Sequence, residues 1–303
     1  MPHTTPTDSA LFALDRATEW LNSEPLTAAG LRGSVVAVQF CTYSCINWLR
    51  TLPYVRAWAS AYRDRGLVVV GAHAPEFAFE REIEGVRRAM AQMGVEHPIV
   101  LDNDYAIWRS FDNHYWPALY LVDGDGRLRY QHFGEGAYDE TEAAIRQLLS
   151  AEGAPVDVEA TGIEAAADWD TLATPETYVG YARGGRPAGP RRLALNEWTL
   201  AGQWDVGEES ARLEEAGGSI TFRFEARDLN LVLTPEGEIP FTVLLDEQPP
   251  GDAHGLDADE LGNGTVSEPR LYQLVRQLGA VRARTCEITF HEPGVRAYVF
   301  TFG

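Results

Sequence analysis

The segment of residues 34–53, SVVAVQFCTYSCINWLRTLP, decides how the first half of the chain folds. Its first seven residues form an almost continuous apolar run, which is typical of a strand that is covered on both faces. Cys41 and Cys45 follow this run, and a helical period of apolar residues begins at Cys45 and continues to residue 62. The segment therefore predicts a buried strand, a short connection and a helix that starts at a cysteine.

Around this segment, the first half of the chain alternates apolar runs with amphipathic periods, as a βαβ sheet does. Asp123-Gly-Asp-Gly126 is a strong signal for a hairpin turn, and Pro53 predicts a kink inside the first helix. Strands are expected near residues 67–70, 98–101, 118–122 and 127–133, and helices near residues 45–62, 83–93, 105–111 and 141–151. This order predicts an α/β domain over residues 1–151.

The composition changes after this domain. Residues 152–175 are rich in Ala, Glu, Asp, Gly and Pro without a sustained apolar period, so we expect a linker there. Beyond it, apolar and polar residues alternate with a period of two at 219–224, 229–233, 241–245, 284–290 and 295–302. Residues 176–303 are therefore predicted to form an all-β second domain, a jelly-roll or β-sandwich.

Charge and composition exclude several classes of function. The 303 residues include 45 acidic and 25 basic side chains, and the net charge of −20 argues against a nucleic-acid partner, which needs a basic surface. No stretch reaches the roughly 20 apolar residues of a membrane span. The start, Met1-Pro-His-Thr-Thr-Pro6, lacks the basic and apolar regions of a signal peptide. We therefore expect a cytoplasmic protein without membrane insertion.

The cysteines point to reactivity rather than to a structural role. The chain has three, Cys41, Cys45 and Cys286, too few and too oddly spaced for a disulfide framework or a zinc site. No histidine pattern indicates a metal, so neither a metal nor a cofactor is expected. Cys286 alternates with apolar neighbours on a predicted strand, which indicates an inert core thiol.

Cys45 is the candidate nucleophile. At the start of a helix its sulfur faces unpaired backbone N–H groups and the positive end of the helix dipole, which favour the thiolate over the thiol. A buried structural thiol is the alternative interpretation, because free cysteine is among the most buried residue types.

Residues 40–53 resemble the active-site segment of thioredoxin-like proteins of the TlpA and DipZ C-terminal type. In that family an aromatic strand end leads into Cys-x-x-Cys, and a proline follows eight residues after the first cysteine, as Pro53 follows Cys45. Residues 102–108, 113–120, 132–138 and 174–180 are also similar to the DipZ pattern. The resemblance implies a thioredoxin-like fold, a carbohydrate-binding-module-like β-sandwich, and a cis bond between Trp116 and Pro117 beside the active cysteine.

The active-site segment departs from the family pattern at three positions. Trp48 stands where the second cysteine belongs, Gln39 where thioredoxins bury an aspartate, and Cys41 where the strand end is usually tryptophan. Glutamine cannot act as a base, and without the second cysteine no vicinal disulfide can close. A standard dithiol cycle is therefore excluded.

Three interpretations stay open. In the first, Cys45 attacks a disulfide or an oxidant and Cys41 resolves it, which requires residues 42–44 to curl until the Cα atoms are roughly 4.4–6.8 Å apart. In the second, Thr42-Tyr-Ser-Cys45 resembles the Thr-x-x-Cys of peroxiredoxins, and the protein is a single-thiol peroxidase. In the third, the domain has lost catalysis and is a binding scaffold. The expected partners are protein or low-molecular-weight thiols and disulfides, with peroxide in the second case.

The substrate is expected to contact residues on both sides of the thiol. These are Thr42, Tyr43, Trp48, Trp116 and Pro117. Trp48 and Trp116 are expected at the rim of the thiol pocket.

The predicted β-sandwich carries aromatic residues that would stack on sugar rings, namely Tyr178, Tyr181, Trp198, Trp204 and Tyr272. Carbohydrate binding is one expectation for this domain, although a fold does not establish a ligand. The other expectation is packing against the first domain or against a second subunit of a homodimer.

Overall fold

The computed structural model describes residues 11–17, 19–189 and 192–303, which form two compact units. The first unit is Met1–Glu164 and the second is Ala165–Gly303, called here the N-terminal and C-terminal units. The stretch Met1–Pro6, on which the expected absence of a signal peptide depends, lies outside the described residues. Among the described residues no helix is long and apolar enough to cross a membrane.

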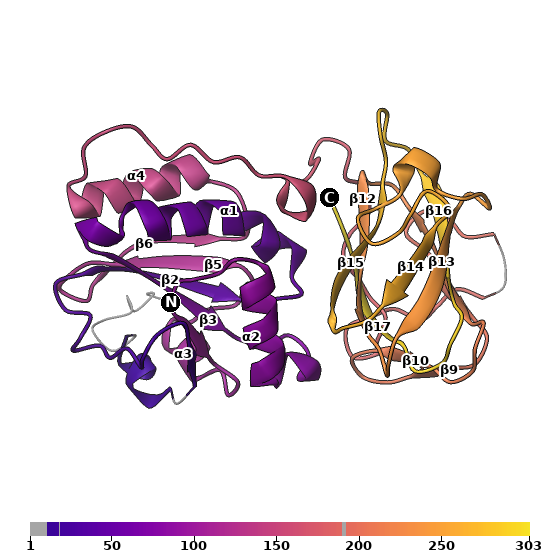
Figure 1. The fold of residues 1–303 in the computed structure, drawn as a ribbon, viewed down its shortest axis with the longest axis horizontal. Helices are drawn as coiled ribbons and strands as arrows, with labels where there is room; N and C mark the ends of the chain where they lie inside the picture. The colour runs from indigo at the N-terminus through magenta and orange to yellow at the C-terminus, as the bar shows by residue number, and fades with distance from the viewer. Residues whose placement is uncertain (1–10, 18, 190–191) are drawn as a thin grey trace, which may run out of the picture. The chain divides into compact units, whose positions relative to one another are not determined.

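The N-terminal unit is built on one mixed six-stranded sheet (Figure 1). In sheet order the strands are β1 (Trp20–Leu21), β4 (Ile99–Leu101), β3 (Leu67–His73), β2 (Val35–Cys41), β5 (Ala118–Val122) and β6 (Leu128–Phe133). Strands β2, β3 and β4 are parallel, and the others run antiparallel to their neighbours. All seven residues of β2 are buried, as the apolar run predicts for a central strand.

Helices cover both faces of this sheet. Helices α1 (Ile46–Ala61) and α4 (Tyr138–Leu149) lie side by side over one face (Figure 1), where Val55, Trp58 and Ile145 pack on β2 and β3. The short α3 (Ala106–Ser110) and the 3-10 helix η1 (Leu11–Arg16) pack on the opposite face. The remaining helices are α2 (Ile83–Gln92) and the 3-10 turns η2 (Arg63–Arg65), η3 (Ala78–Arg81) and η4 (Gly162–Glu164).

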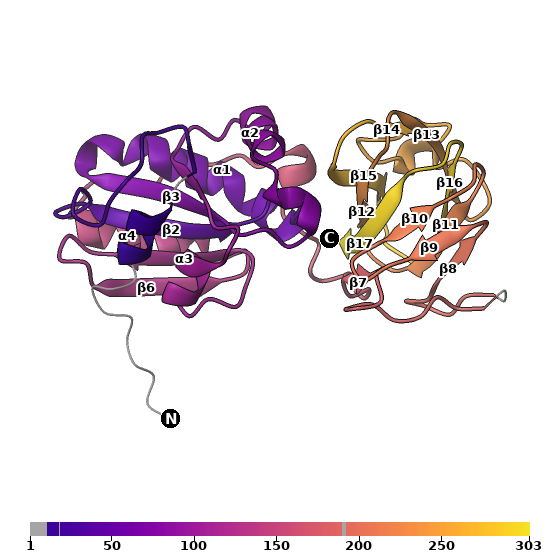
Figure 2. The same ribbon diagram turned by 90° about the horizontal axis from the view of Figure 1, so that it is seen from below.

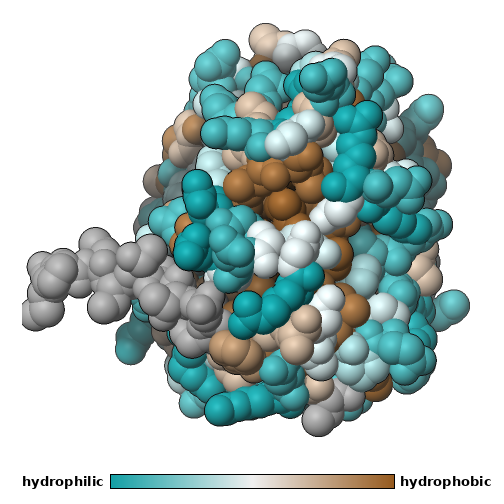
Figure 3. Space-filling view, turned by 90° about the vertical axis from the view of Figure 1, so that its left-hand side faces the viewer, coloured by the Kyte–Doolittle hydropathy of each residue, from teal (hydrophilic) through white to brown (hydrophobic). Residues whose placement is uncertain are grey.

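The predicted α/β pattern is confirmed, with differences of a few residues at the element ends. Helix α1 continues through Pro53 to Ala61. The sequence does not predict strand β1, because two residues are too few to show a period. Figure 3 views this unit from the left-hand side of Figure 1, where a mainly hydrophilic face surrounds a hydrophobic area.

The C-terminal unit is an antiparallel β-sandwich (Figure 2). One sheet has the order β15-β12-β17-β10-β9, with β7 paired to β17, and the other has the order β14-β13-β16-β11-β8. Phe222 of one sheet packs on Phe300 of the other, with ring centroids 4.9 Å apart. The bounds are β7 (Thr177–Tyr178), β8 (Trp198–Ala201), β9 (Trp204–Val206), β10 (Ala211–Leu213), β11 (Ser219–Phe224), β12 (Asp228–Thr234), β13 (Ile239–Leu245), β14 (Asn263–Val266), β15 (Arg270–Arg276), β16 (Arg284–Phe290) and β17 (Arg296–Phe302), with the 3-10 turn η5 (Gly251–Ala253).

The predicted linker, residues 152–175, is divided between the two units. Its first part packs on α1 through η4, where the Glu164 carboxylate accepts two 2.7 Å hydrogen bonds from the Arg56 guanidinium. Its last part joins the sandwich, because the Glu225 N–H donates to the Thr174 hydroxyl at 2.7 Å. Low apolar content suggested a linker, but polar contacts of this kind fix the segment to both units.

Candidate functional site

Cys45 is the N-cap residue of α1, as the sequence predicts. Its backbone N–H donates to the Thr42 carbonyl at 3.2 Å, which closes a tight turn, and its carbonyl accepts from Leu49 at 3.0 Å. The side chain is partly exposed, and the first turn of α1 contains no acidic residue. The free N–H groups and the dipole of α1 therefore favour a thiolate at Cys45.

Cys41, the expected resolving thiol, is fully buried at the end of β2. Burial raises the pKa of this thiol strongly, and the charges of Glu80 and Cys45 raise it further. The connection of residues 42–44 does curl, through the Thr42–Cys45 turn, as a resolving role requires. Cys41 itself is a protonated and inaccessible thiol in this conformation.

Glu80 is a site residue that sequence reasoning missed. It lies on η3, is completely buried, and accepts hydrogen bonds from the Ser44 hydroxyl at 2.6 Å and the Phe77 N–H at 2.9 Å. Burial raises the pKa of Glu80 to about 7, although the hydrogen bond from Ser44 acts in the opposite direction. A carboxyl group that titrates near neutrality therefore holds the turn that carries Cys45.

Trp48 is buried inside the unit, so the prediction that it lies at the rim is wrong. Its indole N–H donates to the Gln39 side-chain oxygen at 3.1 Å, and the Gln39 amide donates to the Thr51 hydroxyl at 2.8 Å. A buried indole needs a hydrogen-bond acceptor for its N–H. Gln39 supplies this acceptor without introducing a charge. Gln39 and Trp48, which both depart from the family pattern, are therefore hydrogen-bonded to each other.

The peptide bond between Trp116 and Pro117 is cis. Ala118 pairs with Phe40, so Pro117 lies at the sheet end from which the Cys45 turn departs. Trp116 is only partly buried, and its indole N–H donates to the Ala74 carbonyl at 3.0 Å. This side of the site is accessible to a substrate.

Exposed aromatic rings extend this accessible side. Tyr115 is 54% exposed and Phe133 is 41% exposed, and their ring centroids are 5.1 Å apart. On the other side of the turn, the expected contact residues Thr42 and Tyr43 are buried. Tyr43 packs instead on His73, with ring centroids 5.7 Å apart, so neither side chain reaches the surface.

His73 is a second polar group that the sequence did not single out for this site. It pairs in register with Cys41 across β2 and β3, and burial lowers its pKa to about 3, so its ring is neutral. Neither ring nitrogen has a hydrogen-bond partner among the described residues. The described residues contain no group of three or more His, Cys, Asp or Glu side chains that could hold a metal.

Arg50, which follows the thiol on α1, is engaged in an ion pair. It is buried and pairs with Glu135, with a nitrogen–oxygen distance of 3.0 Å. Glu135 belongs to the loop after β6, so the ion pair fixes α1 to the strand pair that follows the cis bond.

The aromatic residues of the C-terminal unit differ in accessibility. Trp198 and Tyr272 are buried, so they cannot stack on a sugar. Tyr181 is 61% exposed, whereas Tyr178 is covered by a guanidinium group. Carbohydrate binding stays a prediction, restricted to the accessible rings. Cys286 is fully buried in the core of this unit.

Known proteins are similar to both units. The family model described as "Thioredoxin like C-terminal domain" matches residues 174–303. Protein DipZ of Mycobacterium tuberculosis is 38% identical over 250 residues, which are 77% of this chain and 36% of DipZ. Across both units the chain is therefore similar to thioredoxin-like proteins. It spans about a third of the length of DipZ.

Two further proteins are each similar to less than half of the chain. The thiol-disulfide oxidoreductase YkuV of Bacillus subtilis is 27% identical over 131 residues, which are 43% of this chain and 88% of YkuV. A thioredoxin-like protein solved in solution in its oxidized form is 28% identical and has a TM-score of 0.41, covering 45% of this chain and 90% of its own.

Proposed function

We propose that this thioredoxin-like protein is a thiol-based oxidoreductase in which Cys45 is the nucleophile. The observation that carries the proposal is the position of Cys45, which is partly exposed at the N-cap of α1 and lies at the same end of the sheet as the cis Trp116–Pro117 bond. The proposed partners are protein or low-molecular-weight disulfides, bound along the accessible aromatic side of the site.

In the first half of the reaction, the Cys45 thiolate attacks one sulfur of the substrate disulfide. The substrate S–S bond breaks, a mixed disulfide forms at Cys45, and the other substrate sulfur leaves as a thiolate that takes up a proton. The helix N-terminus stabilises the attacking thiolate, which is the form of cysteine that reacts.

In the second half, Cys41 loses its proton and attacks the Cys45 sulfur. A Cys41–Cys45 disulfide forms, and the second substrate thiol is released, so one substrate disulfide has been reduced and one cysteine pair oxidised. Glu80 is the proposed proton acceptor, because a carboxyl with a pKa of about 7 exchanges protons efficiently at neutral pH. Since Cys41 is buried, this half requires the turn of residues 42–44 to open.

The burial of Cys41 favours a second candidate function, single-thiol exchange at Cys45. In that case an external thiol, rather than Cys41, releases the mixed disulfide. A peroxidase gains less support, because Arg50 is paired with Glu135 and Thr42 is buried, so neither is available to polarise a peroxide.

Mass spectrometry of the three cysteines after graded exposure to oxidised glutathione tests the proposal. A two-step reaction gives a Cys41–Cys45 disulfide in the wild type and a lasting mixed disulfide on Cys45 in Cys41→Ala. The single-thiol candidate gives the mixed disulfide in both proteins. If Cys45 reacts no faster than the buried control Cys286, the unit is a binding scaffold and both candidates are wrong.

A further inference from the structure

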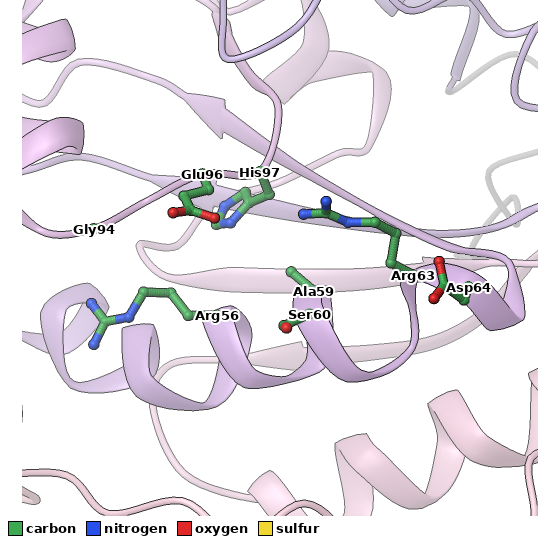
Figure 4. Close-up of a pocket in the computed structure, with 8 residues that line it drawn as sticks. All are labelled: Arg56, Ala59, Ser60, Arg63, Asp64, Gly94, Glu96 and His97. Carbon is green, nitrogen blue, oxygen red and sulfur yellow. The ribbon is translucent and has the colours of Figure 1, made fainter.

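A second cleft lies in the N-terminal unit, near the end of α1 that is opposite Cys45 (Figure 4). It has a volume of about 310 Å³ and lies between the last turns of α1, the turn η2 and the loop that precedes β4. Sites for small molecules usually begin at about 300 Å³. The cleft is therefore large enough for a small ligand, and the binding of that ligand would be separate from the reaction at Cys45.

The lining of this cleft carries unpaired charges of both signs. Arg63 comes from η2 and Glu96 from the loop before β4. Figure 4 shows the Arg63 guanidinium pointing toward His97 from one side, whereas the Glu96 carboxylate lies on the other side of that ring. Neither forms an ion pair or a side-chain hydrogen bond with any residue that the structure describes.

Arg56 also lines the cleft, but its guanidinium group already has hydrogen-bond partners. Its guanidinium donates two hydrogen bonds of 2.7 Å to the Glu164 carboxylate and one of 2.7 Å to the Met93 carbonyl. Its charge is therefore already balanced. Arg63 remains the cation that can receive a ligand, and the hydroxyl of Ser60, three residues earlier, also lines the cleft.

The loop that presents Glu96 is fixed in place. The Asn22 side chain donates to the Val95 carbonyl at 2.8 Å and to the His97 carbonyl at 3.1 Å, on either side of Glu96. His97 is buried, and burial together with the charge of Arg56 lowers its pKa to about 4, so its ring is a neutral wall. The backbone that carries Glu96 is therefore fixed, and the buried His97 ring lies between the Arg63 and Glu96 side chains (Figure 4).

We propose that this cleft binds a small zwitterion. Its carboxylate would be held by Arg63 and Ser60, and its ammonium group by Glu96. A simple anion fits less well, because Asp64 and Glu96 outnumber the one unbalanced arginine. A simple cation would leave Arg63 unpaired, so only a ligand with both charges satisfies both sides.

NMR titration of the full chain with β-alanine tests this site, with propionate and ethylammonium as its two halves at constant ionic strength. Saturable shifts of the Ser60, Gly94 and Glu96 amide signals are expected with β-alanine, and much weaker binding with either half. Arg63→Gln and Glu96→Gln should each weaken β-alanine binding by about tenfold or more, because each removes a charge-assisted hydrogen bond.

The matched control is Arg87→Gln, which removes an exposed arginine of α2 that lies outside the cleft. Its β-alanine titration should match the wild type. Equal binding of propionate and β-alanine, unchanged binding in Arg63→Gln, or the absence of saturable shifts would each overturn the proposal. Arg63 and Glu96 are both exposed, so their variants keep the fold, which the amide spectrum itself verifies.

Discussion

Cys41 and Cys286 are both fully buried on strands, yet their surroundings differ in kind. Burial raises the pKa of both thiols, so neither is a thiolate in the folded protein. Cys286 lies between Phe222 and Leu245 of the neighbouring strands, within an apolar core. Cys41 adjoins a tight turn and the titratable carboxyl of Glu80. Burial alone makes a thiol inert. Only the surroundings of Cys41 offer a proton acceptor, Glu80, and a local segment, residues 42–44, that can open.

The largest effect is expected at Cys45, the partly exposed thiol that follows the turn after Cys41. Cys45→Ser should lower the rate of reduction of a small aromatic disulfide by at least about a hundredfold, because the thiolate is the nucleophile. The matched variant Cys286→Ala should retain the wild-type rate, measured by release of the coloured thiol. Equal losses in the two variants would contradict the assignment of Cys45.

A second large effect is expected at Trp48, which is buried and donates a hydrogen bond to Gln39. Trp48→Ala should lower the free energy of unfolding by about 3–5 kcal/mol, because it leaves a cavity and also removes the donor to Gln39. Chemical denaturation checks this value. Trp116→Ala, at the partly exposed tryptophan, should cost clearly less. A loss of similar size in both variants would mean that Trp48 is not the better packed residue.

Glu80 makes the stability of the N-terminal unit depend on pH. Its pKa is about 7 when folded against 4.5 for a free side chain, so the folded state keeps a proton that the unfolded state loses. The contribution of Glu80 to the free energy of unfolding should therefore fall by about 3 kcal/mol as the pH rises from 4.5 to about 7. Above that pH the contribution should stay level.

Denaturation of Glu80→Gln across the same pH range supplies the comparison. This variant should lose the part of the slope that Glu80 contributes, whereas Glu84→Gln, on the exposed side of α2, should keep the wild-type slope. An unchanged slope in Glu80→Gln would assign the pH dependence to another group.

The smallest effect separates the two buried thiols themselves. Under native conditions Cys41 should react with a labelling reagent faster than Cys286, because opening of residues 42–44 costs less than unfolding of the sandwich core. Ser44→Ala should accelerate the labelling of Cys41 and leave Cys286 unaffected, since it removes the 2.6 Å hydrogen bond to Glu80. Equal rates for the two thiols would show that the turn does not open locally.

The sequence predicts the fold well where periodicity is local. The apolar run of β2 and the period of α1 mark the elements that place Cys45 at a helix start. The short strands β7 to β10 and β15, which is buried along most of its length, lack the alternation that identifies β11 and β16. The fold class could therefore be predicted, but not the complete strand count.

The site was less predictable because its polar contacts join distant parts of the chain. Glu80 stands among exposed acidic residues in the sequence, and only the contact with Ser44, 36 positions away, reveals its burial. Trp48 is predicted at the rim with the other aromatic residues near the thiol, but it is fully buried. Its position depends on the hydrogen bond to Gln39, nine residues earlier on a different element. The cytoplasmic location stays a prediction.

The hydrogen-bonded trio of Gln39, Trp48 and Thr51 has a consequence for anyone who would convert this domain into an ordinary dithiol reductase. Trp48→Cys alone leaves a hole the size of an indole beneath the active-site helix. Gln39→Asp alone places a negative charge in a sealed interior beside a ring nitrogen that offers it only one donor. Each of the two substitutions is costly by itself, so the conversion requires that Gln39 and Trp48 be replaced together.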